Sequence, residues 1–225
     1  MITENQPCKL YFDIEYKKEL NKSVNGDNLL QKFIEILIND LQETFNLKDI
    51  SKQENIIDLT SSTDSKFSHH LIINHPQLVF ASNYHAGKYV KYLCSKLKSI
   101  PEMKITTGKN LDTRECSNTT TFGIFVDEGV YTKNRNFRLY LSSKFNKNVS
   151  LTLTNNACNR SDKCIFFNSL VTNICGNYQI IRSSKTKPQI ELITFDHDAH
   201  QPNVPVIDVK PKTLSMNNPS SCETR

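Results

Sequence analysis

Hydrophobic and polar residues alternate along the segment KLYFDIE, residues 9–15. Apolar residues at every second position from Leu10 to Ile14 fall on one side of an extended chain, and Asp13 and Glu15 fall on the other. The alternation predicts a first strand that buries one face and presents two carboxylates on the other.

Two later segments have the three- and four-residue spacing of amphipathic helices. The first follows Asp27, which we expect to be its N-cap, and extends to about Phe45. The second has Asn83 as its expected N-cap and extends to about Leu97, with Tyr84 among the residues expected to face the core. Both helices should therefore pack against a sheet.

Short apolar runs predict further strands. They cover residues 55–59, 68–73, 122–126, 137–141 and 150–153, and residues 165–174 predict a short helix or strand. Residues 106–121 are polar and lack periodicity, which predicts a mobile loop. From residue 183 onward Pro, Lys, Ser and Asn dominate, which predicts a poorly packed extension.

The first six predicted elements run β-α-β-β-α-β, which indicates an α+β fold. This order is typical of ferredoxin-like and RNA-recognition (RRM-like) folds, here extended by further antiparallel strands, with the first strand between the third and the fourth. We expect one domain over residues 1–182 and an extension over 183–225. Many α+β domains give a similar string, so the order alone does not single out this topology.

The composition sets limits on the class of protein. The chain has 225 residues, a net charge of +5 and a pI near 8.7, an excess of cations compatible with a polyanionic partner but too small to identify one. Seven cysteines, an odd number, are scattered along the chain and are expected to be reduced thiols. No apolar run approaches the roughly 20 residues that span a bilayer, and the first residues lack a signal-peptide pattern. We therefore expect an intracellular protein without a membrane partner.

The Asp13-x-Glu15 pair is the first candidate for chemistry. Two carboxylates on one face of a strand suit a hard divalent cation such as Mg²⁺ or Mn²⁺, with a third carboxylate arriving from elsewhere. Asp127, at the end of the predicted fourth strand, is in a position to supply it. A single DxE also fits two solvated acids on an exposed sheet face.

The run Lys66-Phe67-Ser68-His69-His70 alternates as well, so Lys66, Ser68 and His70 should share a face. A cation, a hydroxyl and an imidazole N–H together form a binding surface for a triphosphate, because none of them repels its charge. His70 could instead be a half-buried histidine with a structural partner. For His69 we adopt this structural interpretation.

Basic and aromatic residues interleave in the segment after Asp127. The residues are Tyr131, Lys133, Arg135, Phe137, Arg138, Tyr140 and Lys144. Such a mixture suits phosphate contacts combined with base or sugar stacking, and makes Lys133 and Arg135 candidates for nucleic-acid binding. Asn136 and Arg138 are two residues apart on a predicted strand and could reach one ligand. A solvated basic edge strand would have the same composition.

Three segments together carry a resemblance to a known family. CKLYFDIEY, SSTDSKFSHHLI and VDEGVYTKNRNFRLYLSSK resemble, in order, the three successive catalytic motifs of the PrimPol family within the archaeo-eukaryotic primase superfamily. The similarity continues through SNYHAGKYVKYL and FFNSLVTN and covers roughly residues 7–180.

The resemblance implies a primase-polymerase catalytic palm that performs template-directed nucleotidyl transfer as a DNA polymerase or primase (EC 2.7.7 type). It implies two divalent ions, Mn²⁺ or Mg²⁺, on the catalytic residues Asp13, Glu15 and Asp127. It also implies nucleotide contacts from Lys66, Ser68, His70, Asn136, Arg138 and Lys144, and a weaker one from Arg135. The implied partners are template and primer DNA, nucleoside triphosphates and a single-strand-binding protein, in the nucleus or mitochondrion, in DNA damage tolerance and replication restart.

The chain also departs from the family pattern. The family has a module before the first carboxylate motif, but Met1 lies only twelve residues before Asp13, and the insertion expected before Asp127 is shortened. Cys158-x5-Cys164 and His197-x2-His200 lack paired zinc-ligand spacing, so we expect neither the zinc module nor a zinc site. Two alternatives to an active polymerase therefore stay open: a degenerate paralogue that binds nucleotide or DNA without turnover, and, ranked below it, a metal-dependent nuclease.

Overall fold

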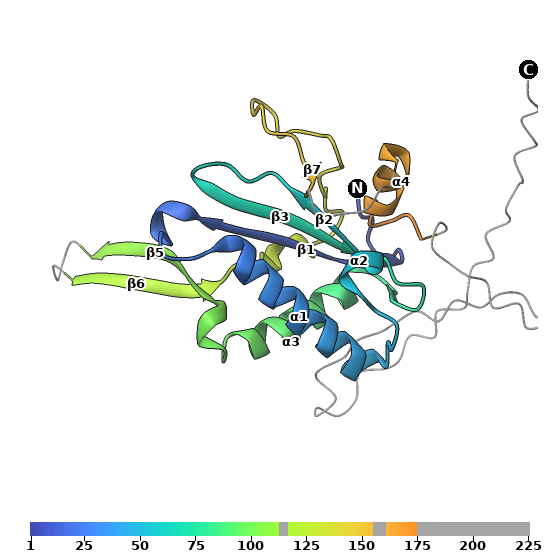
Figure 1. Cartoon of the computed structure of the whole chain (residues 1–225), viewed down its shortest axis with the longest axis horizontal. Coiled ribbons are helices and arrows are strands. Elements are labelled where there is room, and N and C mark those ends of the chain that lie inside the picture. The colour runs from blue at the N-terminus through green and yellow to red at the C-terminus, as the bar shows by residue number, and fades with distance from the viewer. Residues whose placement is uncertain (113–116, 155–160, 175–225) are drawn as a thin grey trace, which may run out of the picture.

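The computed structural model describes residues 1–112, 117–154 and 161–174, with side-chain environments given outside 109–119. Its elements are β1 (Cys8–Lys17), α1 (Gly26–Phe45), α2 (Lys52–Asn55), β2 (Ile56–Thr60), β3 (Lys66–Ile73), β4 (Val79–Phe80), α3 (Asn83–Leu97), β5 (Lys104–Asp112), β6 (Ser117–Ile124), β7 (Thr152–Leu153) and α4 (Asp162–Ser169), with 3₁₀ turns at Lys18–Leu20, Pro101–Met103 and Glu128–Val130. The predicted α+β class is confirmed (Figure 1).

An antiparallel sheet in the order β4-β1-β3-β2-β7 forms the centre of the molecule. β1 pairs with β3 so that Asp13 lies opposite His70 and Glu15 lies opposite Ser68. On the other edge of β1, an isolated antiparallel bridge joins Ile14 to Val126. β1 therefore lies between β3 and the segment that leads to the third predicted carboxylate, while the RRM-like assignment as such stays a prediction.

Helices α1 and α3 lie together on one side of this sheet (Figure 1). Phe12 of β1 packs edge-on against Phe33 of α1, with ring centroids 5.3 Å apart. The two helices are joined at Asp40, whose buried carboxylate accepts hydrogen bonds from Tyr89 at 2.7 Å and from Lys96 at 2.6 Å. α1 and α3 thus cover the apolar face of β1, on the side away from Asp13.

Two helix caps differ from the sequence prediction. Asn25, rather than Asp27, caps α1: its side-chain oxygen accepts a hydrogen bond of 3.0 Å from the backbone N–H of Asn28. Ser82, rather than Asn83, is the N-cap residue of α3. The prediction that Tyr84 faces the core is wrong, because its side chain lies in the first turn of α3 and is 60% exposed.

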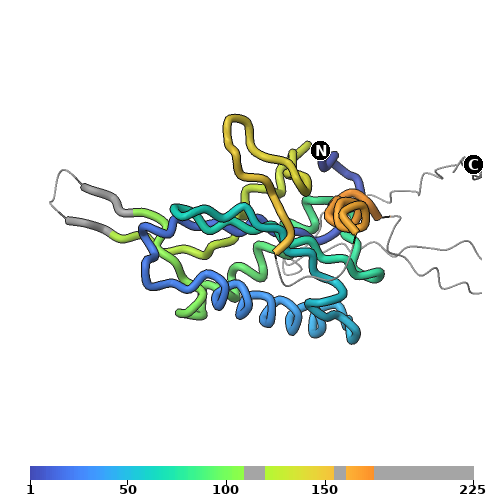
Figure 2. Tube along the Cα trace, turned by 45° about the horizontal axis from the view of Figure 1, so that its top comes forward, coloured from blue at the N-terminus to red at the C-terminus, as the bar shows by residue number. Residues whose placement is uncertain are grey.

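Residues 106–121 were predicted as a loop, and this is wrong for the described part. β5 and β6 form an antiparallel hairpin that projects from the body of the protein (Figure 2). The strands are rich in threonine, which has a high strand propensity but gives no alternation of apolar and polar positions. Hydrophobic periodicity could not detect a hairpin with so little apolar surface.

The strand predicted over residues 137–141 is also absent from the described structure, which assigns no ladder there. Leu141 has φ of 63°, a left-handed conformation that interrupts an extended chain. Residues 150–153 supply only the two-residue strand β7, and the segment 165–174 contains the end of α4. The predicted extension over 183–225 lies outside the described residues.

No helix in the described ranges combines the length and apolarity needed to cross a membrane.

Candidate active site

The face of the sheet opposite the two helices brings the first two polar motifs together. The antiparallel register places Asp13 and Glu15 beside His70 and Ser68, on adjacent strands. Lys66, which precedes both on β3, forms an ion pair with the Glu15 carboxylate. The predicted juxtaposition of carboxylates with a cation, a hydroxyl and an imidazole is therefore present in the structure.

Asp127 reaches the same place through the backbone. Its N–H donates a hydrogen bond of 2.8 Å to the carbonyl oxygen of Asp13, and the N–H of Glu15 donates one of 2.8 Å to the carbonyl oxygen of Phe125. The Asp127 carboxylate accepts a hydrogen bond of 2.8 Å from the N–H of Gly129 and so caps the 3₁₀ turn that follows. The third carboxylate is held next to the first by main-chain hydrogen bonds.

The electrostatics at Asp13 favour a cation. Burial, and then the neighbouring Glu15 and Asp127 carboxylates, raise the pKa of Asp13 to about 6, against a smaller opposite effect of Lys144 and Lys66. Its Oδ1 atom is buried and accepts no hydrogen bond from the described residues. A buried acceptor among like charges is an environment that a divalent cation would stabilise.

The side chains are not yet arranged as a formed metal centre. Within the described ranges, no three His, Cys, Asp or Glu side chains are gathered into a group that could hold an ion. Glu15 is engaged by Lys66, and Asp127 by the N–H of Gly129. One oxygen of each of these two carboxylates is therefore engaged by a group of the chain itself.

His70 is held rigidly beside the carboxylates. Its ring stacks on Phe137, with centroids 4.2 Å apart, and its Nε2 atom lies 3.7 Å from Asp13 Oδ1, which is too long for a hydrogen bond. Burial, and then the nearby cations, of which Arg138 has the largest effect, lower the pKa of His70 to about 3. The imidazole is therefore neutral at physiological pH and offers one N–H donor and one acceptor nitrogen.

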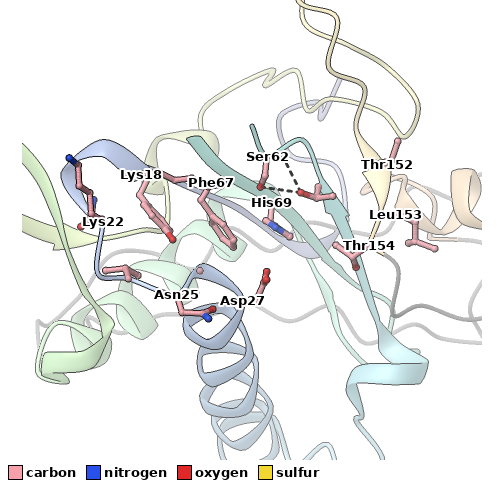
Figure 3. A pocket seen from close by; sticks show the side chains of 15 residues that line it. Lys18, Lys22, Asn25, Asp27, Ser62, Phe67, His69, Thr152, Leu153 and Thr154 are labelled. Carbon is pink, nitrogen blue, oxygen red and sulfur yellow. Dashed lines mark hydrogen bonds between the residues drawn. The ribbon is translucent and has the colours of Figure 1, made fainter. Parts of the chain in front are cut away.

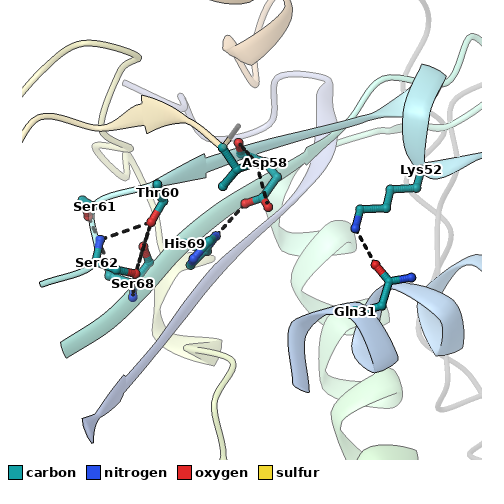
Figure 4. A network of polar contacts seen from close by, with 9 residues as sticks. Gln31, Lys52, Asp58, Thr60, Ser61, Ser62, Ser68 and His69 are labelled. Atoms are coloured by element: carbon teal, nitrogen blue, oxygen red, sulfur yellow. Dashed lines mark hydrogen bonds and ion pairs between the residues drawn. The ribbon is translucent and has the colours of Figure 1, made fainter. Parts of the chain in front are cut away.

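A hydroxyl relay connects Arg138 to β3. Arg138 Nη2 donates a hydrogen bond of 2.5 Å to Ser61 Oγ, and Ser61 Oγ donates one of 3.2 Å to the buried Ser68 Oγ. Figure 4 shows Ser61 and Ser62 just after the end of β2 and Ser68 near the start of β3. Burial lowers the pKa of Arg138, while the negative charges of Asp13 and Glu15 raise it, so the guanidinium lies within electrostatic range of these carboxylates.

The remaining predicted residues are placed less uniformly. Lys144 is exposed but close enough to lower the pKa values of Asp13 and His70. Lys133 forms an ion pair with Glu4 at 2.6 Å. Arg135 is half-buried, and its carbonyl oxygen accepts a hydrogen bond from Ile2 at 2.8 Å. Asn136 is exposed and does not share a strand with Arg138, so the predicted reason for grouping the two does not hold.

Sequence reasoning missed two contributors to this site. Ser61 lies between Arg138 and Ser68, and Phe137 supports the His70 ring. Ser61 directly follows β2 in a polar turn, where nothing in the pattern distinguishes it from Ser62. Phe137 was recognised only as part of the interleaved aromatic and basic run.

A pocket of about 750 Å³ lies on the other face of β3, where Phe67 and His69 point (Figure 3). His69 Nδ1 lies 2.7 Å from Asp58 Oδ1, a carboxylate that also accepts a hydrogen bond from Thr154 (Figure 4). His69 therefore has a half-buried structural partner, in agreement with its interpretation from sequence, and the pocket is separate from the carboxylate face.

Comparison with known proteins gives three informative relatives, each a DNA-directed primase/polymerase protein. The one from Danio rerio is 34% identical over 89% of this chain, that from Mus musculus 32% over 77%, and that from Homo sapiens 30% over 68%. These matches cover 44%, 40% and 37% of the respective relatives, so the chain spans less than half of their length. No protein-family profile matches the chain.

Proposed function

This chain is a homologue of part of the DNA-directed primase/polymerase proteins, and from that premise we propose that it carries a nucleotidyl-transfer centre on the face of β1 and β3. The substrates of the proposed reaction are a nucleoside triphosphate and the 3′-hydroxyl of a primer, or a first nucleotide, on a DNA template. Residence in a DNA-containing compartment, the nucleus or mitochondrion, is part of the same proposal.

Asp13, Glu15 and Asp127 would hold divalent cations, Mn²⁺ or Mg²⁺. The buried and unpaired Oδ1 of Asp13, with its raised pKa, supports this assignment. When bound, such ions supply activation of the attacking oxygen and neutralisation of charge on the phosphoryl group. The role of the chain itself is to hold three carboxylates at fixed backbone positions.

Lys66, Arg138 and Lys144 would bind the triphosphate, with Ser68 and His70 as hydrogen-bond donors. Lys66 now neutralises Glu15, so in this proposal it exchanges the carboxylate for a phosphate oxygen when Glu15 turns to a cation. A neutral His70 can donate to an oxygen of the nucleotide without a competing ion pair to Asp13. The side chains mainly position and neutralise, as expected for phosphoryl transfer.

One observation carries the proposal: a strip of carboxylates lies in register beside a strip of cations and donors on two hydrogen-bonded strands. The test is primer extension on a primed DNA template with Mn²⁺, preceded by a measurement of nucleotide binding. Extension that Asp13→Asn abolishes supports the proposal. Nucleotide binding without extension would favour a paralogue without turnover, and degradation of the primer would favour a nuclease.

A further inference from the structure

The outer side of α3 carries a groove of about 470 Å³ that the proposed reaction does not use. It is formed by one side of the helix and by the segment that follows Asp127. The lining residues are Tyr84, Gly87, Lys88, Lys91, Tyr92, Ser95, Glu128 and Tyr131, and we call this feature the α3 groove. The helical residues recur at spacings of three and four, so they form one continuous stripe.

The α3 groove combines cations with accessible rings. Tyr84 is 60% exposed, and Lys88 Nζ lies 4.9 Å from the centre of its ring. At the other end of the stripe the Tyr92 ring is half-buried, and Lys96, whose Nζ lies 4.7 Å from its centre, is bound to Asp40. The exposed Tyr84 ring offers aromatic surface on which a base can stack.

Charge along the α3 groove favours an anionic ligand. Lys91 is exposed and Lys88 is half-buried, and Glu128 on the opposite wall forms an ion pair with Lys98 at 3.4 Å. Alternating positive charge and aromatic surface is the arrangement that binds a single nucleic-acid strand, because phosphates meet the lysines while bases stack on the rings. A duplex would offer the phosphates but not the faces of its bases.

The α3 groove borders the segment that follows Asp127. Tyr131 lines the groove, and its ring lies 4.8 Å from that of Tyr11, which shares the face of β1 with Asp13. α3 approaches this segment closely at Gly87, where an added Cβ would lie 2.6 Å from Tyr131 Cβ. Asn83 fixes the contact by donating a hydrogen bond of 2.8 Å to the carbonyl oxygen of Thr132. α3 and this wall of the groove are therefore held together by packing and by a hydrogen bond.

We propose that the α3 groove binds a single strand of nucleic acid, over a stripe that extends about 16 Å from Tyr84 to Ser95. The relation of this strand to template or primer rests on the proposed function. Strand binding itself requires neither a metal ion nor a nucleotide, so the two proposals can fail separately.

The test is fluorescence anisotropy of a labelled oligothymidine in EDTA, titrated with the full chain at several salt concentrations. The double variant Lys88→Glu/Lys91→Glu is compared with Lys48→Glu/Lys163→Glu, which makes the same change of charge at exposed residues of other segments. We expect the groove variant to bind at least about tenfold more weakly than the control. The double Lys→Ala form should also reduce the salt slope by about 1.4, roughly 0.7 for each lost phosphate contact.

The aromatic contribution is tested with Tyr84→Ala and Tyr84→Phe. Tyr84→Ala should weaken strand binding at least about fivefold, and Tyr84→Phe should bind like the parent because it keeps the ring. Thermal unfolding of each variant verifies that the fold is retained. The proposal is overturned if the groove and control variants bind equally, if Tyr84→Ala has no effect, or if duplex DNA or polyglutamate competes as well as the single strand.

The same variants separate this proposal from the proposed function. If strand binding depends on the α3 groove but the chain never extends a primer, the α3 groove proposal is supported and the catalytic proposal is not. If the groove variants bind the strand as well as the control variant does, and primer extension still depends on Asp13, the catalytic proposal is supported and the α3 groove proposal fails.

Discussion

The backbone N–H of Asp127 donates a hydrogen bond of 2.8 Å to the carbonyl oxygen of Asp13. Two carboxylate residues from distant parts of the sequence are thereby held side by side, independently of where their side chains turn. Such proximity of like charges is costly without a cation, and it has measurable consequences for stability.

Asp13→Asn should stabilise the protein at neutral pH. Because the pKa of Asp13 is about 6 in the folded protein and 3.8 in the reference state, the folded protein binds the proton more tightly, and stability is lost as pH rises through this window. The free energy of unfolding of the variant should exceed that of the parent by about 1–3 kcal/mol above pH 6, and the difference should shrink toward pH 4. Urea unfolding at a series of pH values measures this.

Asp64→Asn, at an exposed position in the β2–β3 turn, is the control and should show no such pH-dependent gain. Mn²⁺ should raise the unfolding temperature of the parent and of Asp64→Asn but have a much smaller effect on Asp13→Asn. Equal stabilisation of all three by Mn²⁺ would contradict the assigned cation site.

Ser61→Ala should weaken nucleotide binding with little change in stability. The substitution removes the acceptor of Arg138 and the donor to Ser68, so the guanidinium is no longer held toward the site. We expect a loss of affinity of about three- to tenfold, the range of a typical single hydrogen bond. Calorimetric titration with a nucleoside triphosphate measures it.

Ser65→Ala, an exposed residue of the same turn, is the matched control, and Ser61→Thr should recover most of the affinity because it keeps the hydroxyl. A Ser61→Ala variant that binds nucleotide like Ser65→Ala would show that Arg138 does not depend on the relay.

Lys9→Met should stabilise the protein at pH 7. The Lys9 side chain is buried, and burial lowers the pKa of its amine to about 8, so folding disfavours its charged form. This cost is fully present below pH 8 and disappears as pH rises toward 10.5, which predicts a gain of about 1–3 kcal/mol at pH 7 that diminishes at high pH. The Asn168 carbonyl that Lys9 contacts keeps its hydrogen bond from Asn74.

Lys17→Met, at the exposed end of the same strand, serves as the control and should not show this gain. A Lys9→Met variant less stable than the parent at pH 7 would mean that the contact with Asn168 outweighs the cost of burying the amine.

Gly87→Ala should destabilise the protein although it lies inside a helix, where alanine is favoured by about 1 kcal/mol. The new methyl group would lie 2.6 Å from Tyr131 Cβ, so α3 and the segment after Asp127 would have to separate. We expect a net loss of about 1–2 kcal/mol in thermal or urea unfolding. Ser95→Ala, on the exposed side of the same helix, should be neutral or slightly stabilising.

Periodicity predicted the parts of the site that lie on strands. Alternation on both sides of Asp13 and of Ser68 assigned each side chain to a face, and antiparallel pairing of the two strands then fixed their contact. The position of Asp127 followed from the order of elements. These predictions succeeded because burial of one face of a sheet leaves little freedom in register.

Other features depend on contacts that no local pattern encodes. Asn25 and Asp27 can both cap a helix, and the choice is made by the turn that leads into α1. Tyr84 was expected to face the core, but the buried side of the first turn of α3 is formed by Asn83 and Ala86, and Tyr84 lies on the other side. Leu141 adopts a left-handed backbone conformation, which is rare for leucine and could not be predicted from the residue type. This conformation is incompatible with the strand predicted over residues 137–141.

The β5–β6 hairpin projects from the body of the protein, and β6 ends only three residues before Asp127. The hydrogen bonds of Asp127 and Phe125 to β1, and not the hairpin, keep this carboxylate in place. Within the described ranges β5 and β6 form a sheet of their own. The arm beyond Thr106, whose backbone is anchored by Asn21, can therefore differ in length without changing the backbone contacts that place Asp127.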